Sequence, residues 1–161
     1  MASASPLMRL HRRLSPLPLG GTLFSLAYQA AAPYFLTIPA RVQEVAPGRA
    51  RARMAQRPWV RNHLGTVHAI ALCNLAEFVM GACAEATVPD SHRWIPKGMT
   101  VAYLAKARGT MHATAVLDLP PALSDRQEAT VEISVDDDAG TTVFTAQIRI
   151  WITATSPKEA P

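Results

Sequence analysis

The stretch from Val67 to Ala86, VHAIALCNLAEFVMGACAEA, decides the fold. It contains no proline, and apolar residues occupy almost every side of the helix that it would form. A helix that is apolar all round is either buried on all sides or spans a membrane. Asn74 and Glu77 near its middle, together with strand-like patterns elsewhere in the chain, favour a buried core helix.

On both sides of this stretch, apolar and polar residues alternate with the period of β-strands. Two alternating runs precede it and four follow it: residues 36–42, 49–54, 99–107, 111–117, 129–135 and 144–152. The order shows no repeated strand–helix–strand unit, so the sheet should be mainly antiparallel. We therefore predict an α+β domain in which five or six strands curve around one long central helix.

The composition is that of a globular domain, with 161 residues of which 49% are hydrophobic and 17% are charged. The net charge of +4 favours anionic partners such as anionic lipid or phosphorylated small molecules. Nucleic acid is not expected, because no basic and aromatic platform occurs. Cys73 and Cys83 would lie about 15 Å apart on the helix, too far for a disulfide, and they fit no metal-ligand spacing. Free thiols indicate a reducing compartment.

Residues 1–32 are apolar at spacings of three and four, which predicts two short helices separated by Pro16 and Pro18. No acidic residue occurs before Glu44, a bias that mitochondrial transit peptides share. We expect this segment to pack on a domain of residues 33–155 and residues 156–161 to form a disordered tail. The protein should be cytoplasmic, with a mitochondrial location as the alternative.

Three polar side chains around the central helix are candidates for chemistry. Glu77 is a carboxylate among apolar residues, which suits a general base or nucleophile, although a structural pairing would explain it equally well. His68 stands where the helix begins, and the exposed N–H groups there can stabilise an oxyanion. Capping is the ordinary role of such a residue. Asn62 could orient a water or a carbonyl, or form a turn.

In order and spacing, Asn62, His68 and Glu77 resemble the hotdog-fold thioesterases related to the phenylacetate-pathway enzyme. A bacterial and fungal branch of that superfamily, of the DUF4442 type, is still more similar. Its likeness rests on NHLGTVHA at 62–69, Pro33-Tyr34, Pro47-Gly48 and the segment 97–109. The resemblance covers roughly residues 10–155. It implies a hotdog fold, a homodimer or dimer of dimers with sites between subunits, and hydrolysis of acyl-CoA thioesters.

The resemblance also implies roles for single residues. Glu77 would be the base or nucleophile, Asn62 would hold the attacking water or the acyl carbonyl, and the backbone N–H of Ala69 would polarise that carbonyl, supported by His68. Where relatives have paired glycines, this chain has Ala69 and Ile70, which narrows the room for an acyl group. Residues expected to meet CoA are Arg61, His63, Gly65, Lys97, Lys106 and Arg108. Apart from the CoA of the substrate, no cofactor or metal is expected.

Two other functions on the same fold remain open. One is a hydroxyacyl dehydratase, because His63 precedes Glu77 by a spacing seen in those enzymes; the proline- and glycine-rich loop that they carry between the two residues is absent here. The other is a binding module that holds acyl-CoA or a fatty acyl chain without hydrolysing it.

Overall fold

The structure is a computed structural model that describes residues 6–155. The chain begins with helices α1 (Pro6–Leu14) and α2 (Gly20–Ala31) and the 3-10 helix η1 (Pro33–Thr37). Strands β1 (Ala40–Ala46) and β2 (Arg49–Met54), the 3-10 helix η2 (Pro58–Val60) and the long helix α3 (Ala69–Thr87) follow. The last four elements are β3 (His92–Tyr103), β4 (Met111–Val116), β5 (Gln127–Asp136) and β6 (Thr142–Ala154).

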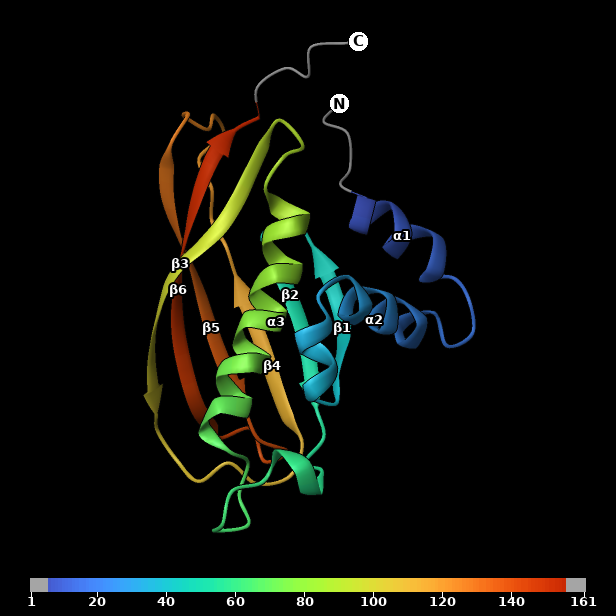
Figure 1. The fold of residues 1–161 in the computed structure, drawn as a ribbon, viewed down its shortest axis with the longest axis vertical. Coiled ribbons are helices and arrows are strands. Elements are labelled where there is room, and N and C mark those ends of the chain that lie inside the picture. The colour runs from blue at the N-terminus through green and yellow to red at the C-terminus, as the bar shows by residue number, and fades with distance from the viewer. Residues whose placement is uncertain (1–5, 156–161) are drawn as a thin grey trace.

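The six strands form one antiparallel sheet in the order β1-β2-β4-β5-β6-β3. The sheet curves around α3, while α1 and α2 lie beside β1, on the side away from β3 and β6 (Figure 1). This is the hotdog fold, which confirms the prediction. By length and composition α3 could cross a membrane, but most of it is buried inside the domain.

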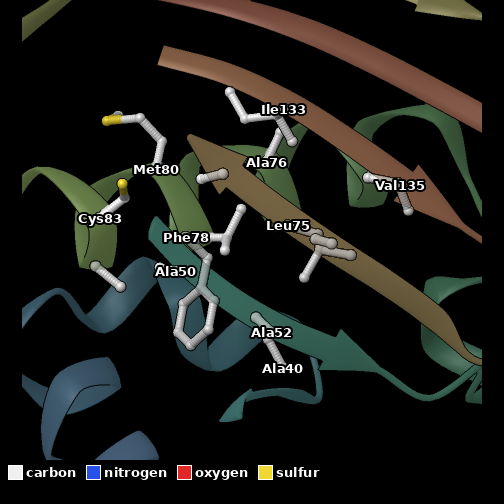
Figure 2. Close-up of a cluster of buried hydrophobic side chains, with 14 of the residues drawn as sticks. Ala40, Ala50, Ala52, Leu75, Ala76, Phe78, Met80, Cys83, Ile133 and Val135 are labelled. Carbon is white, nitrogen blue, oxygen red and sulfur yellow. The ribbon is translucent and has the colours of Figure 1, made fainter. Parts of the chain in front are cut away.

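Small side chains on the strands allow α3 to pack closely on the sheet. Ala50 and Ala52 of β2 are buried, whereas the arginines between them are exposed, as the alternation predicts. Leu75 and Phe78 of α3 are completely buried, and Figure 2 shows Phe78 reaching from α3 towards the alanines of β1 and β2. Large helix residues therefore fill the space that the alanines leave, which fixes the rotation of α3.

An aromatic cluster joins the N-terminal segment to α3. The Tyr28 ring of α2 lies 5.1 Å from the Phe78 ring and 5.9 Å from that of Phe35, measured between centroids. The side-chain amide of Gln29 donates to the carbonyl oxygens of Phe35 in η1, of Ile38 just after it, and of Ala40 at the start of β1. These contacts hold α2 and η1 over the middle of α3 and against the edge of the sheet.

Two strands begin or end at residues other than those that the alternation predicts. Residues 33–37 form a 3-10 helix, and β1 begins only at Ala40, because Pro33 favours a helical start and Pro39 cannot donate a ladder hydrogen bond. The run 99–107 ends as a strand at Tyr103 but begins at His92. Pro96 opposes strand formation locally, so the sequence pattern does not reveal the first half of β3. A β-bulge between Pro96 and Gly98 accommodates the proline in the strand. The predicted tail, 156–161, lies outside the described residues.

Candidate active site

Asn62 holds the turn that leads into α3. Its side-chain oxygen accepts from the backbone N–H of Leu64 (3.0 Å) and Thr66 (3.1 Å), and its amide nitrogen donates to the Thr66 hydroxyl (2.8 Å). Gly65, inside this turn, has a φ of 73°, which glycine adopts without steric cost. Asn62 and Gly65 therefore shape the loop in this structure, and the Asn62 oxygen is already fully used by backbone donors.

His68 caps the N-terminus of α3. Its Nδ1 accepts from the backbone N–H of Ile70 at 3.1 Å, so a neutral ring carries its proton on Nε2. Ala69 is the first helical residue, and its N–H therefore has no acceptor within the helix. This N–H lies at the positive end of the helix dipole, where an oxyanion would be stabilised.

Glu77 lies on the wall of an apolar cavity of about 580 Å³. Its side chain is half-buried, and within residues 6–155 it forms no hydrogen bond or ion pair. Residues from five separate elements line the cavity: Pro6, Leu7, Leu10, Ala27, Tyr28, Ala31, Ala32, Phe35, Glu77, Met80, Gly81, Glu85, Trp94 and Pro96. The arrangement places a carboxylate with free lone pairs beside space for an apolar group.

A second carboxylate, Glu85, lines the same cavity two turns further along α3. It accepts a hydrogen bond from Trp94 Nε1 at 3.2 Å, and burial raises its pKa. Burial also raises the pKa of the Tyr28 hydroxyl, with smaller contributions from the carboxylates of Glu85 and Glu77. That hydroxyl donates to the Phe78 carbonyl at 3.1 Å.

Glu85, Tyr28 and Trp94 are parts of the site that the sequence analysis missed. The spacing of Glu77, Gly81 and Glu85, four residues each, could have indicated a polar stripe on one face of α3. Nothing local in the sequence assigns Tyr28 or Trp94 to that stripe, because both come from distant elements.

The raised pKa of Glu85 predicts a pH dependence of stability. Its protonated form is favoured in the folded protein, so its contribution is complete below about pH 4.3, the usual value in an unfolded chain. The contribution is lost as the pH rises through the higher pKa of the folded state. As the pH rises through this window, the melting temperature of the wild type should fall relative to that of Glu85→Gln. Thermal unfolding of both proteins at several pH values measures this difference. A constant difference would contradict the pKa shift.

Asn74, one turn before Glu77, carries an unused acceptor. Its amide nitrogen donates to the Thr37 hydroxyl at 3.0 Å, but its oxygen is buried and has no partner among the described residues. A buried oxygen without a donor is costly. A buried water is the partner that such an oxygen would take.

The residues predicted to meet CoA separate into two groups. Arg61 forms a β-bridge with Val67, whose N–H donates to the Ala107 carbonyl at 2.9 Å. These contacts bring five of the predicted residues to the N-terminal end of α3: Arg61, His63, Gly65, Lys106 and Arg108. The sixth, Lys97 of β3, instead lies 3.7 Å from Glu128 and 4.7 Å from the centre of the Trp151 ring. It belongs to the outer face of the sheet.

Within one chain, the two halves of the predicted catalytic set stay apart. Ala69 and Glu77 are eight residues apart on α3, which is about 12 Å along the helix axis. One carbonyl group cannot bridge that distance. His63 lies before the helix begins, so it is also remote from the Glu77 of its own chain, and a dehydratase-type pairing of these two residues does not form within the protomer.

The curved sheet around a long apolar helix, with a carboxylate beside an apolar cavity, defines a hotdog-fold protein with a candidate acyl site. The chain belongs to the DUF4442 family, described as a domain of unknown function, whose model matches residues 20–152. A search of curated protein sequences finds no match.

Solved structures have the same fold. The chain in a crystal structure described as genomics APC5556 is 36% identical in sequence to this one. The TM-score is 0.80, and the match covers 92% of this chain and 99% of that one. A Pseudomonas aeruginosa protein of unknown function, described as a probable thioesterase, is 21% identical, with a TM-score of 0.72 and coverage of 86% and 97%. A Haemophilus influenzae thioesterase is 10% identical, with a TM-score of 0.67 and coverage of 79% and 87%. The last two likenesses concern the fold alone.

Proposed function

We propose that this protein hydrolyses acyl-CoA thioesters to a free acid and CoA, with Glu77 as the catalytic carboxylate. The observation that carries the proposal is the position of Glu77, half-buried and unpaired within residues 6–155, on the wall of the apolar cavity. The cavity volume of about 580 Å³ lies in the range of small-molecule sites. Structures of the same fold that carry the name thioesterase add support.

The chemistry requires a nucleophile, a polarised carbonyl and a leaving thiolate. Glu77 either removes a proton from a water that attacks the carbonyl carbon or attacks that carbon itself. The Ala69 N–H stabilises the negative charge that develops on the carbonyl oxygen. The carbon–sulfur bond then breaks, and the CoA thiolate takes up a proton. Where Glu77 attacks directly, water hydrolyses the resulting anhydride and restores the carboxylate.

The site as proposed needs two copies of the chain. Because Ala69 and Glu77 lie about 12 Å apart on one helix, a thioester would meet the Ala69 N–H of one copy and the Glu77 of the other. β3 forms an outer edge of the sheet, with Ile95 and Tyr103 exposed along it. Pairing of two β3 edges would extend the sheet and bring the two α3 helices together. A homodimer, alone or doubled into a tetramer, follows from this arrangement.

The substrate would lie between the two α3 helices. We place the acyl chain in the apolar cavity beside Glu77 of one copy, and the phosphates of CoA near the five basic and loop residues at the N-terminal end of α3 of the other copy. The apolar lining favours medium or long acyl chains over short polar ones. Glu85 and Trp94 would then lie beside the distal part of the chain.

A panel of acyl-CoA substrates tests the proposal. Thiol release by the purified protein should be greatest with medium or long chains, and Ala31→Trp, which puts an indole at the cavity wall, should raise KM for long chains more than for short ones. The protein should sediment as a dimer or tetramer. If no substrate is cleaved but acyl-CoA raises the melting temperature, the binding-module alternative replaces hydrolysis. An absence of both effects would exclude acyl-CoA as the ligand.

A further inference from the structure

Three leucines on the N-terminal segment are about half exposed within residues 6–155. Leu23 and Leu26 of α2 are 46% and 52% exposed, and Leu36 of η1 is 57% exposed. The opposite side of α2, with Phe24 and Tyr28, is buried against the core. Leu26 and Leu36 line one hollow of about 290 Å³ between α2, η1 and β1. The domain therefore presents an apolar surface where a protein normally places polar residues.

Three arginines border this apolar surface. Arg41 and Arg57 line the leucine hollow and, together with Arg53, a neighbouring hollow of about 350 Å³. No aspartate or glutamate lines either hollow. The Arg41 guanidinium donates to the Thr22 hydroxyl of α2 at 2.7 Å, and both residues line the same hollow as Leu26. Basic groups and leucines thus form one continuous face, which we call the leucine–arginine face (Leu23, Leu26, Leu36, Arg41, Arg53 and Arg57).

The arginines repel one another unless an anion lies between them. Arg41 and Arg53 are direct cross-strand partners on β1 and β2, an arrangement that destabilises a sheet when the charges are alike. Within residues 6–155, none of the three arginines is ion-paired with a carboxylate. The face therefore carries positive charge that no carboxylate within residues 6–155 neutralises, and an external anion would neutralise it.

We propose that the leucine–arginine face docks on an anionic phospholipid surface. The leucines enter the boundary between headgroups and acyl chains, and the arginines meet the lipid phosphates, which is the combination that interfacial segments use. A second copy of the chain fits less well, because a two-fold interface would bring the same arginines together. The face lies beside β1, on the side of the molecule away from the β3 edge, so docking and pairing through β3 do not compete (Figure 1).

Vesicle co-sedimentation of the full chain tests the proposal. The protein should bind vesicles of equimolar phosphatidylcholine and phosphatidylglycerol at low salt, bind pure phosphatidylcholine weakly, and detach as salt is added. Arg41→Gln with Arg57→Gln should lower the partition coefficient about thirtyfold, the loss expected for two neutralised cations at an anionic surface. Leu23→Ser with Leu26→Ser should lower it at least about tenfold.

A matched control variant distinguishes binding through this face from a general effect of net charge. Arg126→Gln with Arg149→Gln removes two positive charges elsewhere on the domain and should leave binding unchanged within about twofold. All variants change exposed residues, and their melting curves show whether each is folded. The proposal is overturned if the wild type does not bind the anionic vesicles. It is also overturned if either the double arginine variant or the double leucine variant binds as tightly as the wild type. It is also overturned if the leucine pair reduces the oligomer size in solution, which would assign the face to a second copy.

Discussion

Replacing Glu77 by glutamine is expected to lower thiol release from acyl-CoA by about a hundredfold or more, the usual effect of removing a general acid–base group. Glutamine keeps the size of the side chain but can neither take a proton nor attack a carbonyl. Because Glu77 makes no hydrogen bond or ion pair within residues 6–155, its loss should leave the melting temperature almost unchanged. Steady-state thiol release and thermal unfolding of the same preparation measure both effects.

The matched control is Glu132→Gln, which removes the same charge from the exposed face of β5. It should retain full activity within about twofold, since a surface charge far from the cavity contributes little to the transition state. Wild-type activity in Glu77→Gln would move the chemistry to another residue. Equal loss in both variants would point to a general effect of charge on the protein.

The second large effect is expected for Gly81→Ala, which should lower the free energy of unfolding by about 2 kcal/mol. A β-carbon at position 81 would collide with the Tyr28 hydroxyl, although Trp94 and the rest of the Tyr28 ring are at ordinary contact distance. The hydroxyl would have to leave its hydrogen bond to Phe78, and that cost exceeds the gain of about 1 kcal/mol that alanine normally brings to a helix interior.

A double-mutant cycle isolates this contact. In the background of Tyr28→Phe the colliding hydroxyl is absent, so Gly81→Ala should be neutral or stabilising by up to about 1 kcal/mol. The coupling between the two positions, obtained from denaturant unfolding of all four proteins, should be about 2 kcal/mol or more. An equal cost of Gly81→Ala in both backgrounds would show that the hydroxyl does not determine the close approach of α2 and α3.

The parts of the fold that depend on local hydropathy could be predicted from the sequence. The all-round apolar stretch gives α3, and the alternating runs give most of the six strands, with Glu77 placed on the central helix. The limits of two strands could not be predicted, because Pro39 keeps the residues before Ala40 out of the ladder, whereas Pro96 opposes strand formation locally but is accepted at a bulge of β3.

The candidate site was only partly predictable, for a different physical reason. Asn62, His68 and Ala69 belong to one continuous stretch, so sequence spacing places them together at the start of α3. The cavity beside Glu77 is built by five elements, and the positions of Tyr28 and Trp94 in it follow from tertiary packing alone. The position of Lys97 relative to the other predicted CoA contacts also depends on tertiary structure, since its side chain lies on the outer face of the sheet beside Glu128 and Trp151.

The contacts of α2 with the first strand also affect how copies can join through their sheets. The Gln29 amide occupies carbonyl oxygens along η1 and the start of β1, and the Ser25 hydroxyl accepts the N–H of Val42. Side chains of a helix thus take the bonds that a further strand would use at that edge. A sheet with two open edges can add copies at both ends without limit, which is the geometry of a fibre. Here side chains of α2 take these bonds at Ala40 and Val42, so the first half of the β1 edge is protected against pairing with a further strand.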